Sequence, residues 1–242
     1  MRNLHGFENE PLPQSHHFCD LYCTSVLQQF QPIALGRKAE PFSHPDWIFE
    51  IKWDGFRALA YVHEGKCRLI SRNGNEFKSF PDLSLGILSE LGTRSAILDG
   101  EIVCLDKTGR TQFKDLLFRR GEPRFCAFDV LWTEGEDLRY KPLVERKWKL
   151  RSLLPANNNC ALYSDHIDTH GEDLFQLACE NDLEGIVAKQ KFAPYSTEQQ
   201  TWFKIRNRAY TQWVGREELF ERERETDPDA RLWGFCTMAC AP

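Results

Sequence analysis

Residues 47–62 constrain the fold more than any other segment, because they predict two strands separated by a tight loop. Apolar side chains at Trp47, Phe49 and Ile51 alternate with polar or smaller ones, which is the period of a half-buried strand. Asp54 and Gly55 then form a turn signal, and the apolar run behind them is long enough for a second strand. A chain with this segment is expected to be built on β-sheet.

Short strands are expected to outnumber helices along the rest of the chain. Helical spacing of apolar residues occurs at 81–91, 143–154 and 171–180. Further strand-like runs are found at 66–70, 96–105, 124–132, 185–189 and 202–205. The strands do not alternate strictly with helices, so the pattern favours an α+β architecture of mixed, largely antiparallel sheets flanked by helices over a doubly wound parallel sheet.

The charge balance argues against a protein that coats nucleic acid. The formal net charge is -5, whereas affinity for phosphate comes from Lys and Arg. Any contact with nucleic acid is therefore expected to be local. Two basic clusters are candidates, Arg119, Arg120 and Arg124 in the first and Lys189, Lys191, Lys204, Arg206 and Arg208 in the second. Such clusters are alternatively solvated faces.

Compartment and cysteine usage give a simple expectation. No run of 18 apolar residues is present, so we expect a cytoplasmic protein without a membrane partner. Nine cysteines, an odd and scattered set, suit a reducing compartment. Cys19 and Cys23, with Cys236 and Cys240, would form a tetrahedral zinc site if the termini meet. Their spacing is also one helical turn, which places ordinary apolar cysteines on a shared face.

One loop in the first segment can carry chemistry. Lys52 follows a strand and precedes Asp54, Gly55 and Arg57, so two cations and a flexible backbone lie close together. Such a loop can hold phosphates and present an amine, which attacks in its deprotonated form. The same residues are also compatible with a hairpin in which Lys52 simply pairs with Asp54.

The motifs that follow this loop favour the chemical interpretation. Lys52, Asp54, Gly55 and Arg57 are followed in order by 71–74 (Ser-Arg-Asn-Gly), 99–101 (Asp-Gly-Glu), 125–132 with a central Phe-Asp, 184–189 (Glu-Gly-Ile-Val-Ala-Lys) and 204–206 (Lys-Ile-Arg). This series resembles the covalent nucleotidyltransferases, which include ATP-dependent DNA ligases, RNA ligases and mRNA capping enzymes. The flanking residues are most similar to bacterial DNA ligases of the end-joining type, over about residues 30–216.

The resemblance implies a ligase-type nucleotidyltransferase fold and a three-step reaction. Lys52 would attack the α-phosphorus of ATP, release pyrophosphate and hold AMP as a phosphoramidate. The 5′-phosphate of nicked or broken duplex DNA would then take the AMP, and the 3′-hydroxyl would displace it, in DNA repair or recombination. Nucleotidyl transfer depends on positioning and charge neutralisation, so Mg²⁺ is expected as a cofactor.

The resemblance also implies roles for nucleotide-binding residues. Lys204 and Arg206 would contact the α-phosphate, although the family usually has lysine at both positions, so Arg206 replaces a point donor with a planar fork. Arg72 would contact a phosphate of AMP or of the nick. Phe128 would stack on adenine, although a phenylalanine in an apolar strand is more commonly part of the core.

Further residues of the motifs have implied or supporting roles. Arg57 and Glu101 would lie near the ribose, and the backbone of Glu50 and Ile51 would read the adenine edge. Mg²⁺ prefers oxygen ligands and retains much of its water, so Glu101 and Glu184 would bind it directly or through water. Asp54, Gly55 and Lys189 support the motif set.

The domain organisation expected from the sequence has three parts. Residues 1–29 form an N-terminal lead-in, 30–210 an adenylation (nucleotidyltransferase) domain, and 211–242 a charged C-terminal helix or tail. Ligases of this superfamily carry an OB-fold domain after the last motif, which 36 residues cannot form. No OB-fold is therefore expected.

Three functions are compatible with this organisation. The chain is a minimal ligase, a catalytic subunit whose protein partner supplies the OB-domain function, or a noncatalytic module that binds adenylate or a nick. RNA ligase or another polynucleotide nucleotidyltransferase is the alternative enzyme, which the flanking residues disfavour.

Overall fold

The computed structural model describes residues 29–154, 157, 159–214 and 216. The chain divides into two units, Met1–Phe30 and Gln31–Pro242, and every element described below belongs to the second. The expected short lead-in and charged tail lie largely outside the described residues. Both cysteine pairs considered for zinc lie there as well.

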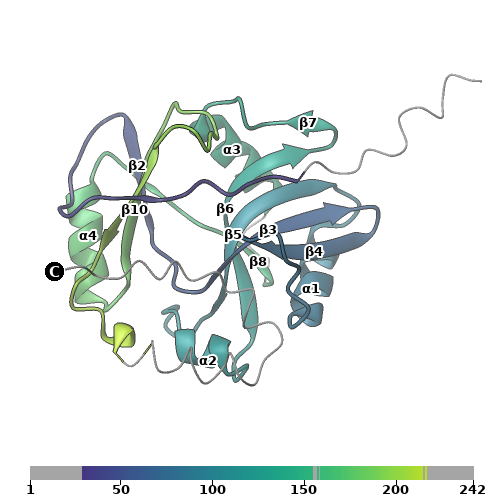
Figure 1. Ribbon diagram of the computed structural model, residues 1–242, viewed down its shortest axis with the longest axis horizontal. Helices are drawn as coiled ribbons and strands as arrows, with labels where there is room; N and C mark the ends of the chain where they lie inside the picture. The colour runs from purple at the N-terminus through teal and green to yellow at the C-terminus, as the bar shows by residue number, and fades with distance from the viewer. Residues whose placement is uncertain (1–28, 155–156, 158, 215, 217–242) are drawn as a thin grey trace, which may run out of the picture. The chain divides into compact units, whose positions relative to one another are not determined.

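Five strands form the smaller of two sheets (Figure 1). In spatial order they are β1 (Gly36–Arg37), β11 (Trp202–Arg206), β10 (Gly185–Gln190), β2 (Trp47–Ile51) and β9 (Ile167–Asp168). The pairs are antiparallel except for β1 with β11, which are parallel. Helix α4 (Gly171–Glu180) covers one face of this sheet, where Leu174 and Ala178 pack against Phe49 and Ile186.

A larger sheet carries the main core. In spatial order its strands are β4 (Lys66–Ser71), β3 (Phe56–His63), β5 (Ala96–Cys104), β6 (Pro123–Thr133) and β7 (Glu136–Asp137), and β8 (Ala161–Tyr163) pairs with β6 in parallel. The remaining pairs are antiparallel. The α+β architecture of mixed, largely antiparallel sheets expected from the sequence is therefore confirmed.

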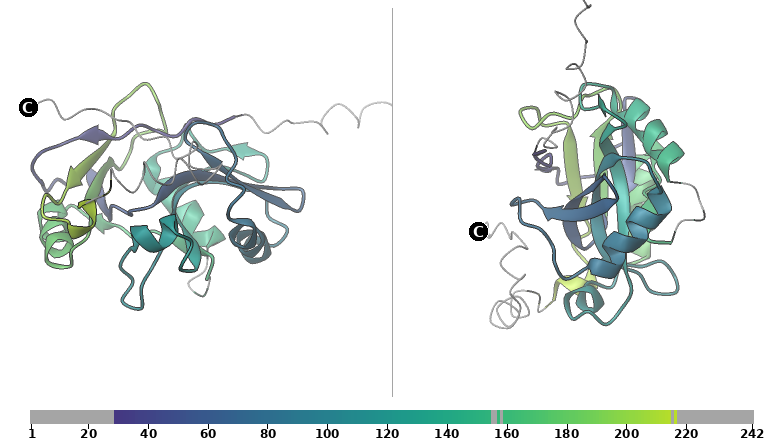
Figure 2. Two further views of the ribbon diagram at one scale, coloured as in Figure 1. Left: turned by 60° about the horizontal axis from the view of Figure 1, so that its bottom comes forward. Right: turned by 90° about the vertical axis from the view of Figure 1, so that its right-hand side faces the viewer.

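Three helices pack into one apolar core on the larger sheet, α1 (Pro81–Leu91), α2 (Phe113–Leu117) and α3 (Leu143–Leu153). Figure 2 shows α1 and α3 on the same side of its strands. Helix α1 has proline in its first turn, where the missing N–H has no intrahelical acceptor to lose. Its buried residues Leu83, Ile87 and Leu91 are spaced by four, so they form one face of the helix.

The two strands predicted at 47–62 exist but do not form a hairpin. Strand β2 pairs with β10 and β9, whereas β3 pairs with β4 and β5. The tight loop between them therefore carries the chain from one sheet to the other. This topology excludes the hairpin with a Lys52–Asp54 pair, and it positions the loop where the two sheets meet.

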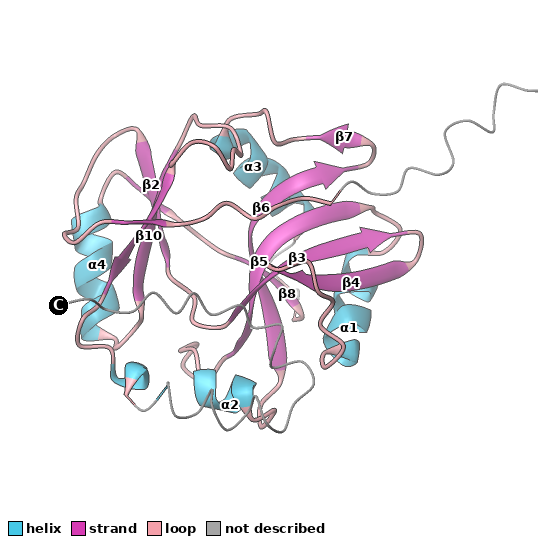
Figure 3. Cartoon of the chain, in the orientation of Figure 1, coloured by secondary structure: helices cyan, strands magenta, loops and turns pink. Residues whose placement is uncertain are grey.

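The expected elements agree closely with the structure (Figure 3). Helices α1 and α4 and strand β2 have the expected bounds. The remaining expected strands and α3 differ by one residue at one or both ends. The segments that were not expected are α2, the 3₁₀ helix η1 (Thr211–Trp213), and strands β1, β7, β8 and β9. Each is five residues or shorter, too short to show a hydrophobic period. Within the described residues, no helix has the length and apolar character needed to span a membrane.

Candidate active site

A pocket lies between the two sheets. Its walls include Glu50, Lys189 and Trp202 from the smaller sheet, Arg57, Glu101 and Phe128 from the larger sheet, and Lys52 from the loop that joins them. Four of the sequence motifs therefore contribute to one concave site. Such a pocket with converging polar groups is the usual form of a small-molecule site.

Side-chain alternation determines which residues of the smaller sheet face the pocket. Val187 in β10 is the register partner of Glu50 in β2 and of Lys204 in β11, so these three side chains lie on the same face. Ile186 and Ala188 point the other way and join the core under α4. The period of two therefore separates a polar site face from an apolar packing face within each strand.

Lys52 is held at both its backbone and its side chain by the Glu-Gly motif. Its N–H donates to the carbonyl oxygen of Gly185 at 2.9 Å, and its Nζ lies 2.5 Å from Oε2 of Glu184. Only glycine fits at 185, because φ is 134° and a Cβ would lie 2.1 Å from the carbonyl oxygen of Ile205. With its side chain 16% exposed, the amine remains accessible from the pocket.

Two buried carboxyls accompany Lys52. Burial raises the pKa of Glu101 to about 7, although the charges of Lys52 and Arg57 lower it. Burial also raises the pKa of Glu184, against the opposing charge of Lys52, and Asp54 adds to the rise. Glu184 also raises the pKa of Glu101 by charge repulsion. Burial therefore disfavours the ionised form of both carboxyls.

This donor set fits a magnesium ion. Among the described residues, no three His, Cys, Asp or Glu side chains form a metal-ligand group, so a cation here would have two carboxyl groups, Glu101 and Glu184. Mg²⁺ is commonly held by one or two carboxylates, substrate phosphates and several waters. The mutual repulsion of the two carboxylates would be relieved by a divalent cation.

Arg57 is fixed on the opposite wall by two charged hydrogen bonds. Its Nε donates to Oδ1 of Asp99 at 2.7 Å and its Nη2 donates to Oδ2 at 2.6 Å. The Tyr195 hydroxyl donates to the same Oδ2 at 2.6 Å. This bidentate geometry holds the guanidinium in one plane. Its carbon lies 4.7 Å from the centroid of the Phe128 ring.

Aromatic rings and a buried lysine line the deepest part of the pocket. Phe128 is 8% exposed and makes an edge contact with Trp202, with ring centroids 5.9 Å apart. The Nζ of Lys189 lies 4.4 Å from the Phe128 ring and 4.0 Å from the Trp202 ring. Burial lowers the pKa of Lys189 to about 8. Lys189 therefore belongs to the pocket wall, and the interpretation of this residue as part of a surface cluster for nucleic acid was wrong.

Glu50 links this wall to helix α3. Its Oε2 accepts a hydrogen bond from Lys189 at 2.9 Å, and its Oε1 lies 3.0 Å from Nζ of Lys147. Burial would raise the pKa of Glu50, but the charges of the two lysines hold it below its usual value. The motif comparison missed the contribution of Lys147. The helical spacing of α3 could have indicated this residue, because Arg146 and Lys147 occupy buried positions on its apolar face. Buried cations need acidic partners.

The 204–206 motif lies beside the pocket. Lys204 is half-buried, and burial lowers its pKa to about 8 with further contributions from the charges of Arg206, Lys52 and Arg37. Arg206 is exposed, and its guanidinium lies 4.6 Å from the Trp213 ring. Lys204 therefore lies within the electrostatic range of Lys52, as a phosphate-binding role requires.

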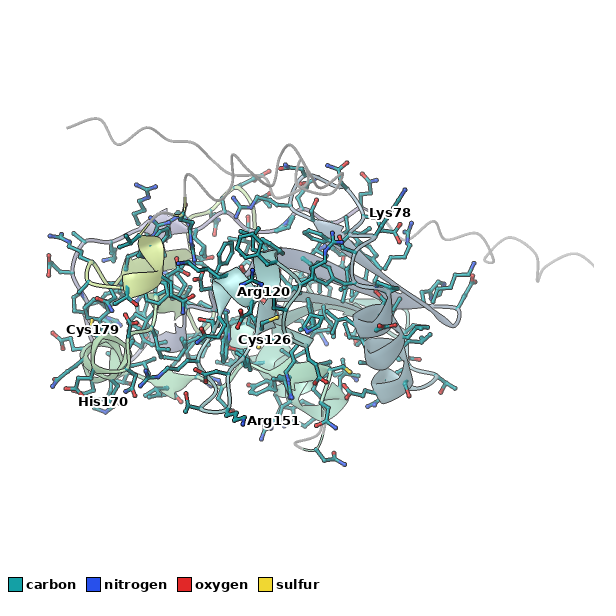
Figure 4. All side chains as sticks on the ribbon, turned by 90° about the horizontal axis from the view of Figure 1, so that it is seen from below. Lys78, Arg120, Cys126, Arg151, His170 and Cys179 are labelled. Atoms are coloured by element: carbon teal, nitrogen blue, oxygen red, sulfur yellow. The ribbon has the colours of Figure 1, made fainter. Side chains whose placement is uncertain are left out.

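Arg72 lies outside the pocket. It is exposed in the turn that follows β4, where the N–H of Asn75 donates to Oγ of Ser71 at 3.2 Å. Arg120 is likewise exposed, in the turn after α2 (Figure 4), and its guanidinium lies 5.0 Å from the Phe118 ring. The structure therefore does not bring Arg72 together with Lys52.

Asp54 has two partners that the motifs did not suggest. Its Oδ2 accepts a hydrogen bond from the Tyr210 hydroxyl at 2.8 Å and another from Nη2 of Arg216. Both partners follow the last motif, and Arg216 is 8% exposed. The sequence signal was weak, because both residues precede or open the charged segment that was expected to be solvated.

Comparison with known proteins identifies the family to which this chain belongs. The model of the ATP dependent DNA ligase domain family matches residues 32–206. The multifunctional non-homologous end joining protein LigD of Pseudomonas aeruginosa is 34% identical over 169 residues, which cover 66% of this chain and 20% of that protein. The SPbeta prophage-derived DNA ligase-like protein LigB of Bacillus subtilis is 33% identical over 192 residues, which cover 75% of this chain and 68% of that protein.

A solved structure agrees with the sequence matches. A mycobacterial DNA ligase D complexed with ATP and MES has a TM-score of 0.66 and 27% identity, and the match covers 73% of this chain and 60% of that one. The chain spans about a fifth of the length of the Pseudomonas LigD protein that it matches. The family model covers most of the residues that build both sheets and the pocket. The chain belongs to the ATP dependent DNA ligase domain family.

Proposed function

We propose that this chain is the adenylating core of an ATP-dependent DNA ligase and forms a covalent lysyl-AMP intermediate at Lys52. The observation that carries the proposal is the contact between Nζ of Lys52 and Oε2 of Glu184, at 2.5 Å, in a pocket walled by both sheets. The family match and the ATP complex of a similar mycobacterial ligase support ATP as the substrate.

In the first step the amine of Lys52 is the nucleophile. Nζ passes a proton to Glu184, a better acceptor than an ordinary glutamate because burial raises its pKa. Nζ then forms a bond to the α-phosphorus of ATP, the bond to the pyrophosphate oxygen breaks with its electron pair on pyrophosphate, and Nζ releases a second proton to solvent to give the phosphoramidate. Lys204 and Arg206 neutralise the α-phosphate oxygens.

The other pocket residues hold the nucleotide. Phe128 offers a ring face to adenine, while the backbone of Glu50 and Ile51 reads its edge. Arg57 and Glu101 lie near the ribose, and the fixed plane of the guanidinium limits the sugar to one orientation. Arg72, outside the pocket in the free chain, contacts a phosphate of the nick. These assignments follow the motif positions and the pocket lining.

Mg²⁺ would be held by Glu101 and Glu184. When bound, it supplies positive charge to the phosphate oxygens that carry the developing negative charge. Burial raises the pKa of both carboxyls, and the charge of Glu184 adds to the rise at Glu101. A divalent cation between them would stabilise their ionised forms.

The later steps act on duplex DNA. We assign the adenylation domain to residues 30–210, preceded by the lead-in at 1–29 and followed by the segment 211–242. The 5′-phosphate of a nick takes AMP from Lys52, and the 3′-hydroxyl displaces it. A protein partner that supplies the OB-domain function supports these steps if the chain alone stops at lysyl-AMP.

Labelling with ATP carrying a radioactive α-phosphate tests the first step. The full chain with Mg²⁺ is expected to retain label after denaturation, and Lys52→Ala is expected to retain none because it has no amine. Lys78→Ala, an exposed lysine in the turn before α1 (Figure 4), is the matched control and should label as the wild type does. An unlabelled wild type would remove the proposal.

Nicked substrates test the later steps and the polymer. The labelled chain is offered a duplex with one DNA nick or a matched duplex with an RNA nick. In a separate reaction, GTP replaces ATP in the labelling step. Sealing of the DNA nick alone is expected. Preference for the RNA nick identifies an RNA ligase, and label without sealing identifies a core that needs a partner.

A further inference from the structure

The segment that follows β11 crosses from one sheet to the other. Its start is tied to the smaller sheet, where the N–H of Asn207 donates to the carbonyl oxygen of Glu184 at 3.0 Å. Farther on, Thr211 donates to Asp182 through its N–H at 2.9 Å and through its hydroxyl at 2.5 Å. We call the described residues 207–214 and Arg216 the strap.

The far end of the strap is tied to the larger sheet. The side chain of Gln212 donates to the carbonyl oxygen of Thr111 at 2.7 Å and accepts from the N–H of Phe113 at 3.0 Å. Figure 1 shows η1 beside α2, at the same end of the molecule as the lower end of β10. The strap therefore joins the two sheets below the loop that carries Lys52.

Arg216 connects the strap to the loop of residues 52–55, which we call the nucleophile loop. Its guanidinium carbon lies 3.9 Å from the Phe113 ring centroid and 4.7 Å from that of Trp213, and its Nη2 donates to Oδ2 of Asp54. Tyr210 donates to the same oxygen at 2.8 Å. Two strap residues thus occupy one carboxylate oxygen of Asp54, and two rings lie against the guanidinium.

The loop between Lys52 and Arg57 has little freedom on its other side. A Cβ at Gly55 would lie 2.0 Å from the carbonyl oxygen of Ile102, so the backbone just after Asp54 is pressed against β5. With one side of the loop against β5 and the Asp54 carboxylate held by the strap, the position of Lys52 depends on both contacts.

Asp54 is also a competing partner for Lys52. The two residues are separated by one position, and a free carboxylate this close would attract the lysine ammonium. In the structure Nζ contacts Glu184 instead, and the Asp54 carboxylate is occupied by the strap. The charge of Arg216 also reaches Glu184 and opposes the effect of Asp54 on its pKa. Arg216 thus acts on the site by geometry and by charge.

We propose that Arg216 is a positioning residue for adenylation: by holding Asp54 it keeps Lys52 directed into the pocket toward Glu184. The inference rests on the proposed function. Removing one partner of a buried Arg–Asp pair strongly destabilises a protein. The effect of Arg216 on the rate of the chemical step is therefore measured in variants that are shown to be folded.

Single-turnover labelling with α-labelled ATP over a range of ATP concentrations tests this role in the full chain. Arg216→Met is expected to lower the adenylation rate at saturating ATP by about 10- to 100-fold, as a misplaced reacting group does. The apparent affinity for ATP should change less than about threefold, because Arg216 is outside the pocket lining. Arg216→Lys should recover part of the rate by restoring the charge.

Arg151→Met is the matched control. Arg151 also lies near an aspartate, 3.5 Å from Asp165, and its guanidinium carbon is 4.8 Å from the Tyr163 ring. It lies on α3, and Figure 4 labels its side chain. The control should adenylate at the wild-type rate. Thermal unfolding of each variant establishes that it is folded at the assay temperature.

A double-mutant cycle with Asp54→Asn separates positioning from a general loss of structure. If Arg216 acts through Asp54, adding Arg216→Met to Asp54→Asn should lower the rate by much less than Arg216→Met does alone. Wild-type rates in Arg216→Met, a loss confined to ATP affinity, or additive losses in the cycle would each overturn the inference while leaving the proposed function intact. An unlabelled wild type would remove both.

Discussion

At the residue scale, Glu50 shows how one buried carboxylate organises the pocket. It lies between Lys147 and Lys189, and it accepts a hydrogen bond from the Ser164 hydroxyl at 3.3 Å. Its Oε2 therefore has two hydrogen-bond donors, and its Oε1 is paired with the charge of Lys147 without a hydrogen bond. A buried carboxylate with fewer partners would take up a proton, and the lysines would lose the charge that holds them in the wall.

Lys189 gives this arrangement a pH dependence. Its pKa is about 8 in the folded chain and about 10.4 in an unfolded chain. Between these values the unfolded chain binds more protons, so stability rises with pH. We expect Lys189→Met to remove on the order of 1 to 3 kcal/mol of the rise in unfolding free energy between pH 8 and 10.

Denaturant unfolding of both proteins at pH 8, 9 and 10 measures this difference. Lys78→Met, at an exposed position, is the control and should keep the wild-type slope. Lys204 has a similarly lowered pKa but is present in every protein compared, so it does not affect the difference. Equal slopes in wild type and Lys189→Met would contradict the expectation.

At the residue scale the motifs predicted the members of the site better than their surroundings. Lys52, Glu101 and Glu184 lie together as their order in the sequence suggested. Lys147 and Arg216 did not stand out, because a charged residue in a helix or near a charged tail usually faces water. Only the packing of α3 and of the strap showed that these two positions are buried.

At the element scale, the loop of residues 52–55 connects two sheets, although the sequence pattern was compatible with a hairpin turn. It joins β2 of the smaller sheet to β3 of the larger one. Alternation of apolar residues predicted both strands, but pairing partners depend on contacts between segments far apart in the sequence. The local pattern therefore could not distinguish a hairpin from a crossing between sheets.

Gly55 tests how tightly this loop is packed. An added Cβ would meet the backbone of β5 at 2.0 Å, and neither backbone segment can move away without disturbing its sheet. We expect Gly55→Ala to lower the unfolding free energy by at least about 2 kcal/mol, and to slow adenylation because the loop shifts.

Gly121→Ala is the matched control for this prediction. Its added Cβ would be 3.4 Å from the Cys104 sulfur, which is ordinary contact, so a change within about 0.5 kcal/mol is expected. Chemical denaturation of the two variants and the wild type supplies the comparison. A Gly55→Ala protein as stable as Gly121→Ala would show that the loop has room to adjust.

At the scale of the whole molecule, the site belongs to neither sheet alone. Lys189 and Trp202 come from the smaller sheet, Arg57 and Phe128 from the larger one. A nucleotide bound between these walls would add contacts to both sheets. Ligand binding to the folded chain alone raises its stability by mass action, so ATP is expected to stabilise the molecule as one cooperative body.

Thermal unfolding with ATP but without Mg²⁺ measures this effect before chemistry proceeds. ATP at about 100 times its dissociation constant should add about 2.7 kcal/mol to the unfolding free energy. GTP at the same concentration should add less if the pocket accepts adenine. Phe128→Ala is expected to reduce the ATP effect, because the ring face beside the pocket is lost. No shift with ATP in the wild type would contradict a nucleotide site here.

The sequence by itself determined the α+β class, most strands and helices, and the identity of the motif residues that surround Lys52. These are local properties, because the side-chain period and the order of motifs can be read from consecutive residues. The tertiary structure alone decided that β2 and β3 belong to different sheets, that Lys189 is buried, and that Arg216 contacts Asp54. Those features depend on contacts between distant segments, where burial and charge pairing are satisfied jointly and leave no period in the sequence.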